Sequence, residues 1–271
     1  FMEATKPNPL TLVGRVLRHH PLSSLLATRP SPNLWRALGG FFPDERLQQL
    51  FGRYATYVGS SPLSTPATLM LIAHVELEGV WLVDGGMHRL ARTMADLGQR
   101  LGVDLHLNTH VSEVLVKNGK AVGVRLDDGT ALTADAVVFN GDTQAIATGH
   151  LGESASSAVT LRPSRQRALS ALTWCIKGQA SGFDLDHHNV FFEPNYPSEF
   201  NTIFEKRQVP SKPTVYVCAQ DRGPAGNRNE AERFLMLVNA PANGDNQTWS
   251  TDDVNHIRDN ALAVLHRCGL T

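Results

Sequence analysis

Cysteine is scarce in this sequence and follows no recognisable pattern. The three cysteines, Cys175, Cys218 and Cys268, are odd in number, lie far apart and form no Cys-x-x-Cys pair. Their spacing therefore indicates neither a disulfide framework nor a zinc site. Such cysteine usage is typical of a reducing compartment, and we expect a cytoplasmic protein.

An excess of charge and a long apolar run are missing as well. The 25 basic and 26 acidic residues leave a formal net charge of -1, which provides no field to attract nucleic acid or to hold the whole protein on an anionic bilayer. No apolar run approaches the ~20 residues that a membrane-spanning helix needs, and no signal peptide is visible. We expect no nucleic-acid partner, and any membrane contact to be peripheral.

Several motifs that carry chemistry are absent from the sequence. It contains no Gly-x-Gly-x-x-Gly fingerprint of dinucleotide binding, no His-Glu-x-x-His metal motif and no Gly-x-Ser-x-Gly nucleophile elbow. His106 and His110 lie in a stretch whose alternation predicts a strand, and His187-His188 has the pattern of a loop or strand-entry pair. We therefore predict no metal site, and no residue is nominated as catalytic.

The residues that are present predict a folded protein with a helical first part. Of the 271 residues, 42% are hydrophobic and 19% charged, as in globular proteins. Apolar residues recur at helical spacing beside a basic face over residues 10–26. Residues 34–42 carry three large aromatic side chains, which either pack inside or touch an apolar partner; the residues alone favour packing. Further helices are expected over 43–58 and 66–73, the second of them buried.

The rest of the chain predicts strands and two more helices, and so an α+β, mixed α/β fold. A strand, a glycine turn and a helix are expected over 79–101. Strand alternation at 103–108, a β-meander over 111–126 and a buried strand over 134–142 follow. Beyond residue 160 we expect a separate mixed or antiparallel sheet, with strands at 172–179, 189–193, 214–221 and 233–241, and then a helix that a capping box opens at Ser250.

Two adjacent runs carry a family resemblance. Residues 51–76 (FGRYATYVGSSPLSTPATLMLIAHVE) and 79–87 (GVWLVDGGM) resemble the phytoene desaturase family of carotenoid enzymes, and most of all its hydroxyneurosporene and methoxyneurosporene desaturase branch, the carotenoid 3,4-desaturases. Later segments follow in family order, at 134–140, 187–192, 196–200, 213–217 and 234–241. The resemblance covers nearly all of the chain from Leu34 onward.

This resemblance implies the central part of a two-domain, FAD-dependent flavoprotein of the amine-oxidase type. Family members begin with a glycine-rich turn for the FAD pyrophosphate and end with a segment over the flavin ring, so the chain is expected to be an internal fragment lacking the N-terminal dinucleotide-binding motif. The resemblance implies four divisions. Residues 1–78 would be the helical part of the substrate domain, expected to face the membrane, and residues 79–152 an insert of the FAD domain. Residues 153–249 would form the sheet of the substrate domain, and residues 250–271 a helix that returns toward the FAD domain.

The resemblance also implies cofactor contacts at three places. Gly85, Gly86 and Met87 would lie near the flavin, and the backbone of Val111 would lie near the adenine end. The segment Asn140, Gly141 and Asp142 would lie near the pyrophosphate or the ring. Glycines before a helix let a backbone approach a ligand closely, although two glycines alone are more often simple turn chemistry.

The activity implied is that of an oxidoreductase acting on CH–CH groups, which passes a hydride from an acyclic carotenoid to FAD. A water-insoluble substrate would arrive from the bilayer, which favours peripheral membrane association through the first helix. We predict that the fragment alone is inactive and retains little or no FAD. Retinol saturases and carotenoid isomerases share the scaffold and remain alternatives. A second alternative is an apo fragment that binds an apolar ligand or self-associates through exposed apolar surface.

Overall fold

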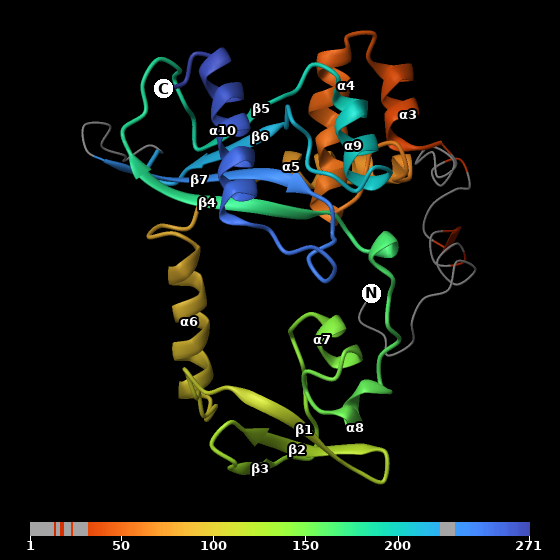
Figure 1. Ribbon diagram of the computed structural model, residues 1–271, viewed down its shortest axis with the longest axis vertical. Helices are drawn as coiled ribbons and strands as arrows, with labels where there is room; N and C mark the ends of the chain where they lie inside the picture. The colour runs from red at the N-terminus through yellow and green to blue at the C-terminus, as the bar shows by residue number, and fades with distance from the viewer. Residues whose placement is uncertain (1–13, 15–16, 19–22, 24–31, 223–230) are drawn as a thin grey trace. The chain divides into compact units, whose positions relative to one another are not determined.

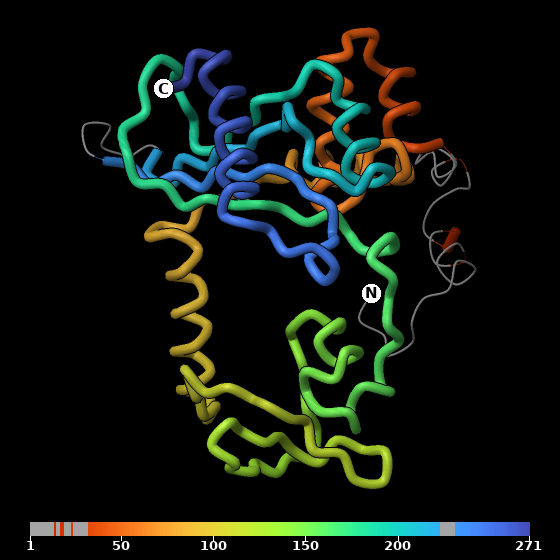
Figure 2. The backbone as a smooth tube through the Cα atoms, in the orientation of Figure 1, coloured from red at the N-terminus to blue at the C-terminus, as the bar shows by residue number. Residues whose placement is uncertain are grey.

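A computed structural model describes residues 14, 17–18, 23, 32–222 and 231–271, and these divide into two compact units. Unit 1 comprises residues 1–79 and 167–271, and unit 2 comprises residues 80–166. Figure 2 follows the chain from the first part of unit 1 through unit 2 and back into unit 1. The helix predicted at 10–26 lies almost wholly outside the described residues. The functional divisions drawn from the sequence stay predictions, because compactness does not assign a segment to a cofactor or a substrate.

A four-stranded antiparallel sheet forms the centre of unit 1. Its strands lie in the order β4-β7-β6-β5, so strands distant in sequence become neighbours (Figure 1). The bounds are β4 (Ser170–Gly178), β5 (His188–Phe191), β6 (Val215–Ala219) and β7 (Glu232–Ala240). Each of the four expected strands is present, and the prediction of a separate sheet is confirmed.

One face of this sheet is covered by the last helix, α10 (Thr251–Arg267), as Figure 1 shows. Alternate residues of β6 and β7, among them Val217 and Met236, pack with Ile257 and Val264 in the main apolar core of the unit. The predicted capping box is present. The Ser250 hydroxyl accepts a hydrogen bond from the backbone N–H of Asp253, and the Asp253 carboxylate accepts one from the backbone N–H of Ser250.

Short helices complete unit 1 beside the sheet. They are α3 (Leu34–Phe41), α4 (Glu45–Gly52), the 3-10 helices η1 (Arg53–Val58) and η2 (Ala67–Met70), α5 (Leu71–Leu77) and α9 (Tyr196–Phe204). The aromatic stretch at 34–42 mainly packs inside, as expected: Trp35 lies against Tyr196, and Phe42 stacks on Phe51. Gln49 donates from its amide to the carbonyl of Glu193, which ties α4 to the chain before α9.

The helix predicted at 66–73 is present but only partly buried. It forms as η2 followed by α5: Ala67 is buried and Leu69 and Met70 pack against a small core, whereas Leu71 exposes 55% of its surface and Leu77, at the end of α5, exposes 84%. The expectation of burial holds for η2 and was wrong for α5, because a run of consecutive apolar residues does not separate a core helix from a helix at an apolar surface. α5 therefore leaves apolar side chains available for contact.

Unit 2 combines a long helix, a small sheet and short helices. Its elements are α6 (Met87–Arg100), β1 (Val111–Lys117), β2 (Lys120–Leu126), β3 (Ala131–Thr133), α7 (Thr143–Ala147), α8 (Glu153–Ser156) and η3 (Ser164–Gln166). The three strands form an antiparallel meander in the order β1-β2-β3, which confirms the prediction. Val114, Leu151 and Ala155 form the small core beneath it.

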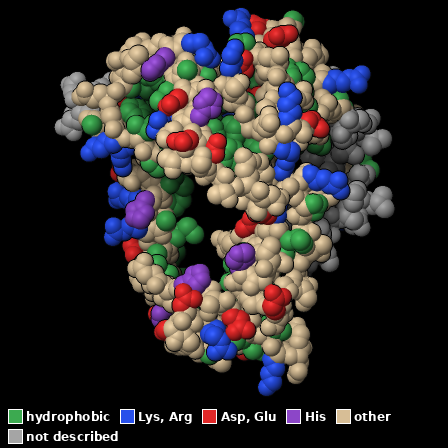
Figure 3. Space-filling view, viewed as in Figure 1, with side chains coloured by type: hydrophobic (Ala, Val, Ile, Leu, Met, Phe, Trp, Pro, Cys, Tyr) green, Lys and Arg blue, Asp and Glu red, His purple; other side chains and the backbone are tan. Residues whose placement is uncertain are grey.

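The helix α6 exposes an apolar stripe. In Figure 3 green side chains follow one side of this helix and blue arginines lie on another. The exposed apolar residues at helical spacing are Met87, Leu90, Met94, Leu97 and Leu101. A stripe of this kind is the side that an amphipathic helix normally buries.

Three strands expected in unit 2 are not formed. Residues 79–83, 103–108 and 134–142 run as irregular chain, and Val138, expected in a buried strand, is 92% exposed. A run of β-branched residues becomes a strand only when a neighbouring strand supplies hydrogen bonds, and none of the described residues does so for these segments. Among the described residues, no helix has the length and apolar character to cross a bilayer.

Candidate active site

The sheet of unit 1 presents a second face, opposite to α10, that combines apolar and polar side chains. Cross-strand partners share a face, so the pairs His188–Cys218 and Tyr216–Leu237 follow one another along it. The neighbouring residue Val217 points the other way, into the core with α10. Further members of this face are Thr173, Cys175, Val190 and Leu235. They are exposed or half-buried, so this face can contact a ligand.

Polar groups gather at one end of this sheet face. The phenol of Tyr216 lies 2.8 Å from Nδ1 of His188, with the two rings stacked. Partial burial, and then the nearby thiol of Cys218, raise the pKa of Tyr216 above its usual range. Partial burial and the neighbouring His187 lower the pKa of His188. Both groups are therefore held in their neutral forms near pH 7, where they can exchange hydrogen bonds without adding charge.

Two tyrosines and a carboxylate stand near this polar end. The hydroxyl groups of Tyr54 and Tyr57 both donate to the carboxylate of Glu76 on α5, and the Tyr57 contact measures 3.3 Å. Desolvation first, and Glu76 second, raise the pKa of Tyr54 to about 12. The same causes raise the pKa of Tyr57, and the nearness of Tyr57 contributes to the raised pKa of Tyr216. Among the described residues, the hydrogen-bond partners of this carboxylate are phenols and not a cation.

An open groove of about 500 Å³ begins beside these tyrosines at Val58. Apolar side chains form most of its lining, and four hydroxyl side chains interrupt them. The lining residues are Val58, Ser60, Ser64, Thr65, Pro66, Thr68, Leu69, Leu71 and Ile72. Thr65 is buried, and no group of the described residues forms a hydrogen bond with its hydroxyl. The groove suits an apolar ligand that carries at most a small polar group.

The glycine turn singled out in the sequence lies in unit 2, at the start of α6. Gly85 and Gly86 have φ angles of 80° and 79°, which L side chains rarely adopt. Gly86 is the N-cap and gives no side-chain hydrogen bond to the helix, and a Cβ added there would meet no atom within 4 Å. The first turn of α6 thus has no side-chain cap, and although the Arg89 N–H donates to the Gly86 carbonyl, the earlier N–H groups are suited to a polar or anionic group. Met87 is exposed beside them.

The other predicted cofactor residues lie around the small core of unit 2. Val111 begins β1 and packs at the edge of this core with Val137 and Ile146. Asp142 accepts from the Gln144 backbone N–H at 2.9 Å and caps α7. Val111 and the segment around Asp142 are therefore attached to one core.

Asn140 and Gly141 occupy the exposed turn before α7. A Cβ on Gly141 would come within 2.3 Å of the far end of the Phe139 ring, which is 39% exposed and can move aside. This contact therefore gives no evidence for or against a ligand. The assignment of Asn140, Gly141 and Asp142 to the cofactor stays a prediction.

Sequence reasoning did not find the polar end of the sheet face. Its members come from residues 54–57, 76, 187–188 and 216–218, which no motif links. The alternation of β6 carried a usable signal, because it places Tyr216 and Cys218 on one face. Only the antiparallel register brings His188 opposite them.

Comparison with known proteins gives a consistent set of similarities. A family model described as flavin containing amine oxidoreductase matches residues 18–180. The chain is 47% identical over its full length to a hydroxyneurosporene desaturase of Rubrivivax gelatinosus, and covers 52% of it. It is 42% identical to the hydroxyneurosporene desaturase of Cereibacter sphaeroides, with 90% of this chain and 49% of that protein covered. The chain thus spans about half the length of these relatives.

More distant similarities agree with this assignment. A phytoene desaturase of Neurospora crassa is 35% identical, with 79% of this chain and 38% of that protein covered. Among solved structures, an oxidoreductase from Methanosarcina mazei aligns with a TM-score of 0.50 at 17% identity, over 89% of this chain and 54% of that chain, which supports the fold. The resemblance recognised in the sequence and the expectation of a flavoprotein fold are confirmed, and the chain belongs to the flavin-containing amine oxidoreductase family.

Proposed function

We propose that this chain is part of a FAD-dependent desaturase of acyclic carotenoids, with a hydroxylated carotenoid such as hydroxyneurosporene as substrate. The observation that carries the proposal is the 47% identity to a hydroxyneurosporene desaturase, which extends over the whole chain. Relatives named as hydroxyneurosporene and phytoene desaturases match between 79% and 100% of this chain.

The geometry of unit 1 supports an elongated apolar substrate. The sheet face and the groove from Val58 to Ile72 offer apolar side chains, with phenols and hydroxyls in place of charged pairs. Desaturation needs a site that aligns one C–C bond and excludes water, because the cofactor carries the difficult chemistry. The hydroxyls at the groove, such as those of Ser60 and Ser64, are suited to the hydroxyl end of the substrate.

The turn at Gly85 and Gly86 supports the flavin part of the proposal. Its backbone is open, and the uncapped first turn of α6 provides N–H donors. These residues would hold part of the flavin nucleotide, which supplies a hydride acceptor when bound. The protein's own contribution would be to position donors and keep the site dry.

The decisive experiment uses the natural full-length protein that contains these residues. It is purified, loaded with FAD and given hydroxyneurosporene in liposomes, and the products are separated by chromatography and read by absorbance. We expect a product with one more conjugated double bond. Isomerisation of the carotenoid without loss of hydrogen, or saturation of retinol supplied in a parallel reaction, would instead support one of the alternative flavoprotein activities.

A glycine variant tests the cofactor assignment separately. Gly86→Val places a branched side chain at a φ of 79° and in the space before α6, so we expect most of the bound FAD to be lost on purification. Gly129→Val is a matched control, because Gly129 also has a positive φ and open space around it but lies in the turn after β2. Equal flavin content in wild type and Gly86→Val would contradict the assignment.

We also infer peripheral contact with the bilayer from which a carotenoid must come. Supporting it, Leu71, Val75 and Leu77 expose their side chains along α5, and Tyr57 on η1 adjoins this helix through Glu76. Flotation of the full-length protein with liposomes tests the inference. We expect Val75→Glu with Leu77→Glu to reduce the bound fraction several-fold; an unchanged fraction would argue against this surface.

A further inference from the structure

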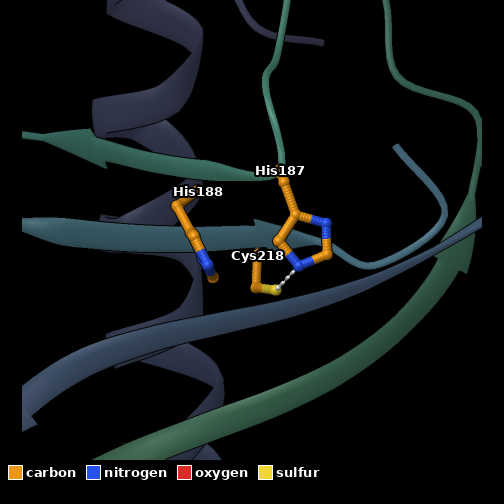
Figure 4. Close-up of side chains that lie close together, drawn as sticks. All are labelled: His187, His188 and Cys218. Atoms are coloured by element: carbon orange, nitrogen blue, oxygen red, sulfur yellow. Dashed lines mark hydrogen bonds between the residues drawn. The ribbon is translucent and has the colours of Figure 1, made fainter. Parts of the chain in front are cut away.

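Three potential metal ligands meet at the edge of the sheet face in unit 1. One ring nitrogen each of His187 and His188 and the sulfur of Cys218 all lie within 4.8 Å of one another. Figure 4 shows both imidazoles extending from the start of β5 toward Cys218 on β6. The sulfur lies 3.8 Å from Nε2 of His187. The proposed desaturation assigns no role to this cluster.

The orientation of His187 is fixed by a buried network. Its Nδ1–H donates to the carbonyl of Arg222 at 2.8 Å, which leaves the lone pair of Nε2 directed at the cluster. The Arg222 side chain is in turn held by two hydrogen bonds to Glu232, at 2.7 and 2.8 Å, and by one to the Leu185 carbonyl. A histidine ligand whose other nitrogen binds a backbone carbonyl is the usual outer-shell arrangement of protein metal sites.

His188 is oriented in a comparable way. Its Nδ1 exchanges a hydrogen bond with the Tyr216 hydroxyl, and its ring meets that of His187 edge-on at 4.5 Å between centroids. The strand register places His188 directly opposite Cys218. Cys218 is buried and His188 is exposed, so the cluster has an enclosed sulfur end and a side open to solvent.

We infer that His187, His188 and Cys218 form a binding site for a single thiophilic divalent cation, with Zn²⁺ as the expected ion and an open fourth position. A tetrahedral zinc ion, with Zn–N of about 2.1 Å and Zn–S of about 2.3 Å, holds nitrogen and sulfur about 3.5 Å apart. The sulfur and Nε2 of His187 are already close to this separation. Shifts of about 1 Å in the side chains would bring all three donors to the ion.

The combination of ligands selects the class of metal. One thiolate with two imidazoles favours zinc and its chemical relatives over magnesium or calcium, which prefer oxygen ligands. Three protein ligands leave a position for water or another group. This inference does not rest on the desaturase activity, and it can be tested without carotenoid or flavin.

The test is a metal titration of the full chain under reducing conditions after removal of metals by a chelator. We expect one Co²⁺ per chain, with a thiolate-to-cobalt absorption band in the near ultraviolet that Zn²⁺ abolishes by displacement. Cys218→Ser should remove the band, and His187→Gln should weaken Co²⁺ binding at least tenfold. Cys175→Ser and Cys268→Ser are matched controls, because these cysteines lie outside the cluster, and both should keep the band.

Variants that fail to fold are recognised by circular dichroism and thermal unfolding without metal. X-ray absorption of the zinc-loaded wild type then provides evidence that needs no substitution: one sulfur and two imidazole nitrogens around zinc support the site. Absence of the thiolate band at one equivalent of Co²⁺, or its persistence in folded Cys218→Ser, would overturn the inference. A zinc ion without sulfur in its shell would do the same.

Discussion

Replacing Glu232 by glutamine is expected to destabilise unit 1 strongly, because Glu232 forms a buried ion pair. Its carboxylate accepts two hydrogen bonds from Arg222, and the two side chains are only 4% and 8% exposed. Removing one partner of such a pair leaves a buried charge uncompensated, which typically costs about 3–5 kcal/mol. Among the described residues, the Arg222 side chain would keep the Leu185 carbonyl, a neutral amide and the more distant charge of Asp184.

A neighbouring ion pair provides the control. Arg233 and Asp221 form an adjacent pair where the chain leaves β6 and enters β7, but their side chains are 66% and 29% exposed. Asp221→Asn should therefore cost no more than about 1 kcal/mol. Urea unfolding followed by circular dichroism measures both variants. The reasoning about burial fails if Glu232→Gln costs as little as Asp221→Asn, or if Asp221→Asn costs as much as Glu232→Gln.

Two further predictions concern pH and helix capping. Burial raises the pKa of Glu199 above its usual 4.5, although the Thr214 backbone and Asn239 donate hydrogen bonds to its carboxylate. Protonation of Glu199 therefore stabilises the folded state below pH 4.5, and this stability is lost as the pH rises through the raised pKa. Glu199→Gln should flatten this loss when free energies of unfolding are compared at pH 4.5 and near neutrality; an unchanged slope would contradict it. Ser250→Ala removes the cap of α10 and should cost about 1 kcal/mol in urea melts, whereas a neutral effect would mean that packing alone holds the helix end.

Elements with strong local signals could be predicted from the sequence. The strands around Thr173, Tyr216 and Met236 combine β-branched and aromatic residues between turn residues, and they pair as expected. The helix from Thr251 was marked by its capping box and by its apolar spacing. Flanking residues and periodicity are local properties, so one sequence contains them.

Features that depend on distant partners could not be predicted. The segment 134–142 has strand-forming residues, but a strand exists only where another strand hydrogen-bonds to it. His187 and His188 gave no metal signal, because the third donor, Cys218, becomes their neighbour only through the pairing of β5 with β6. The burial of Glu199 likewise depends on Asn239, from a strand forty residues away.

The order of segments in unit 1 has a consequence for how the protein is made. Because residues 80–166 interrupt this unit, the ribosome releases α3, α4 and α5 well before β4 to β7 and α9. Unit 2 can form its meander at once from local contacts, and the first helices can assemble a small core of their own around Leu34, Leu38 and Ala55. Their contacts with the later chain, such as that of Trp35 with Tyr196, must wait until α9 has been made.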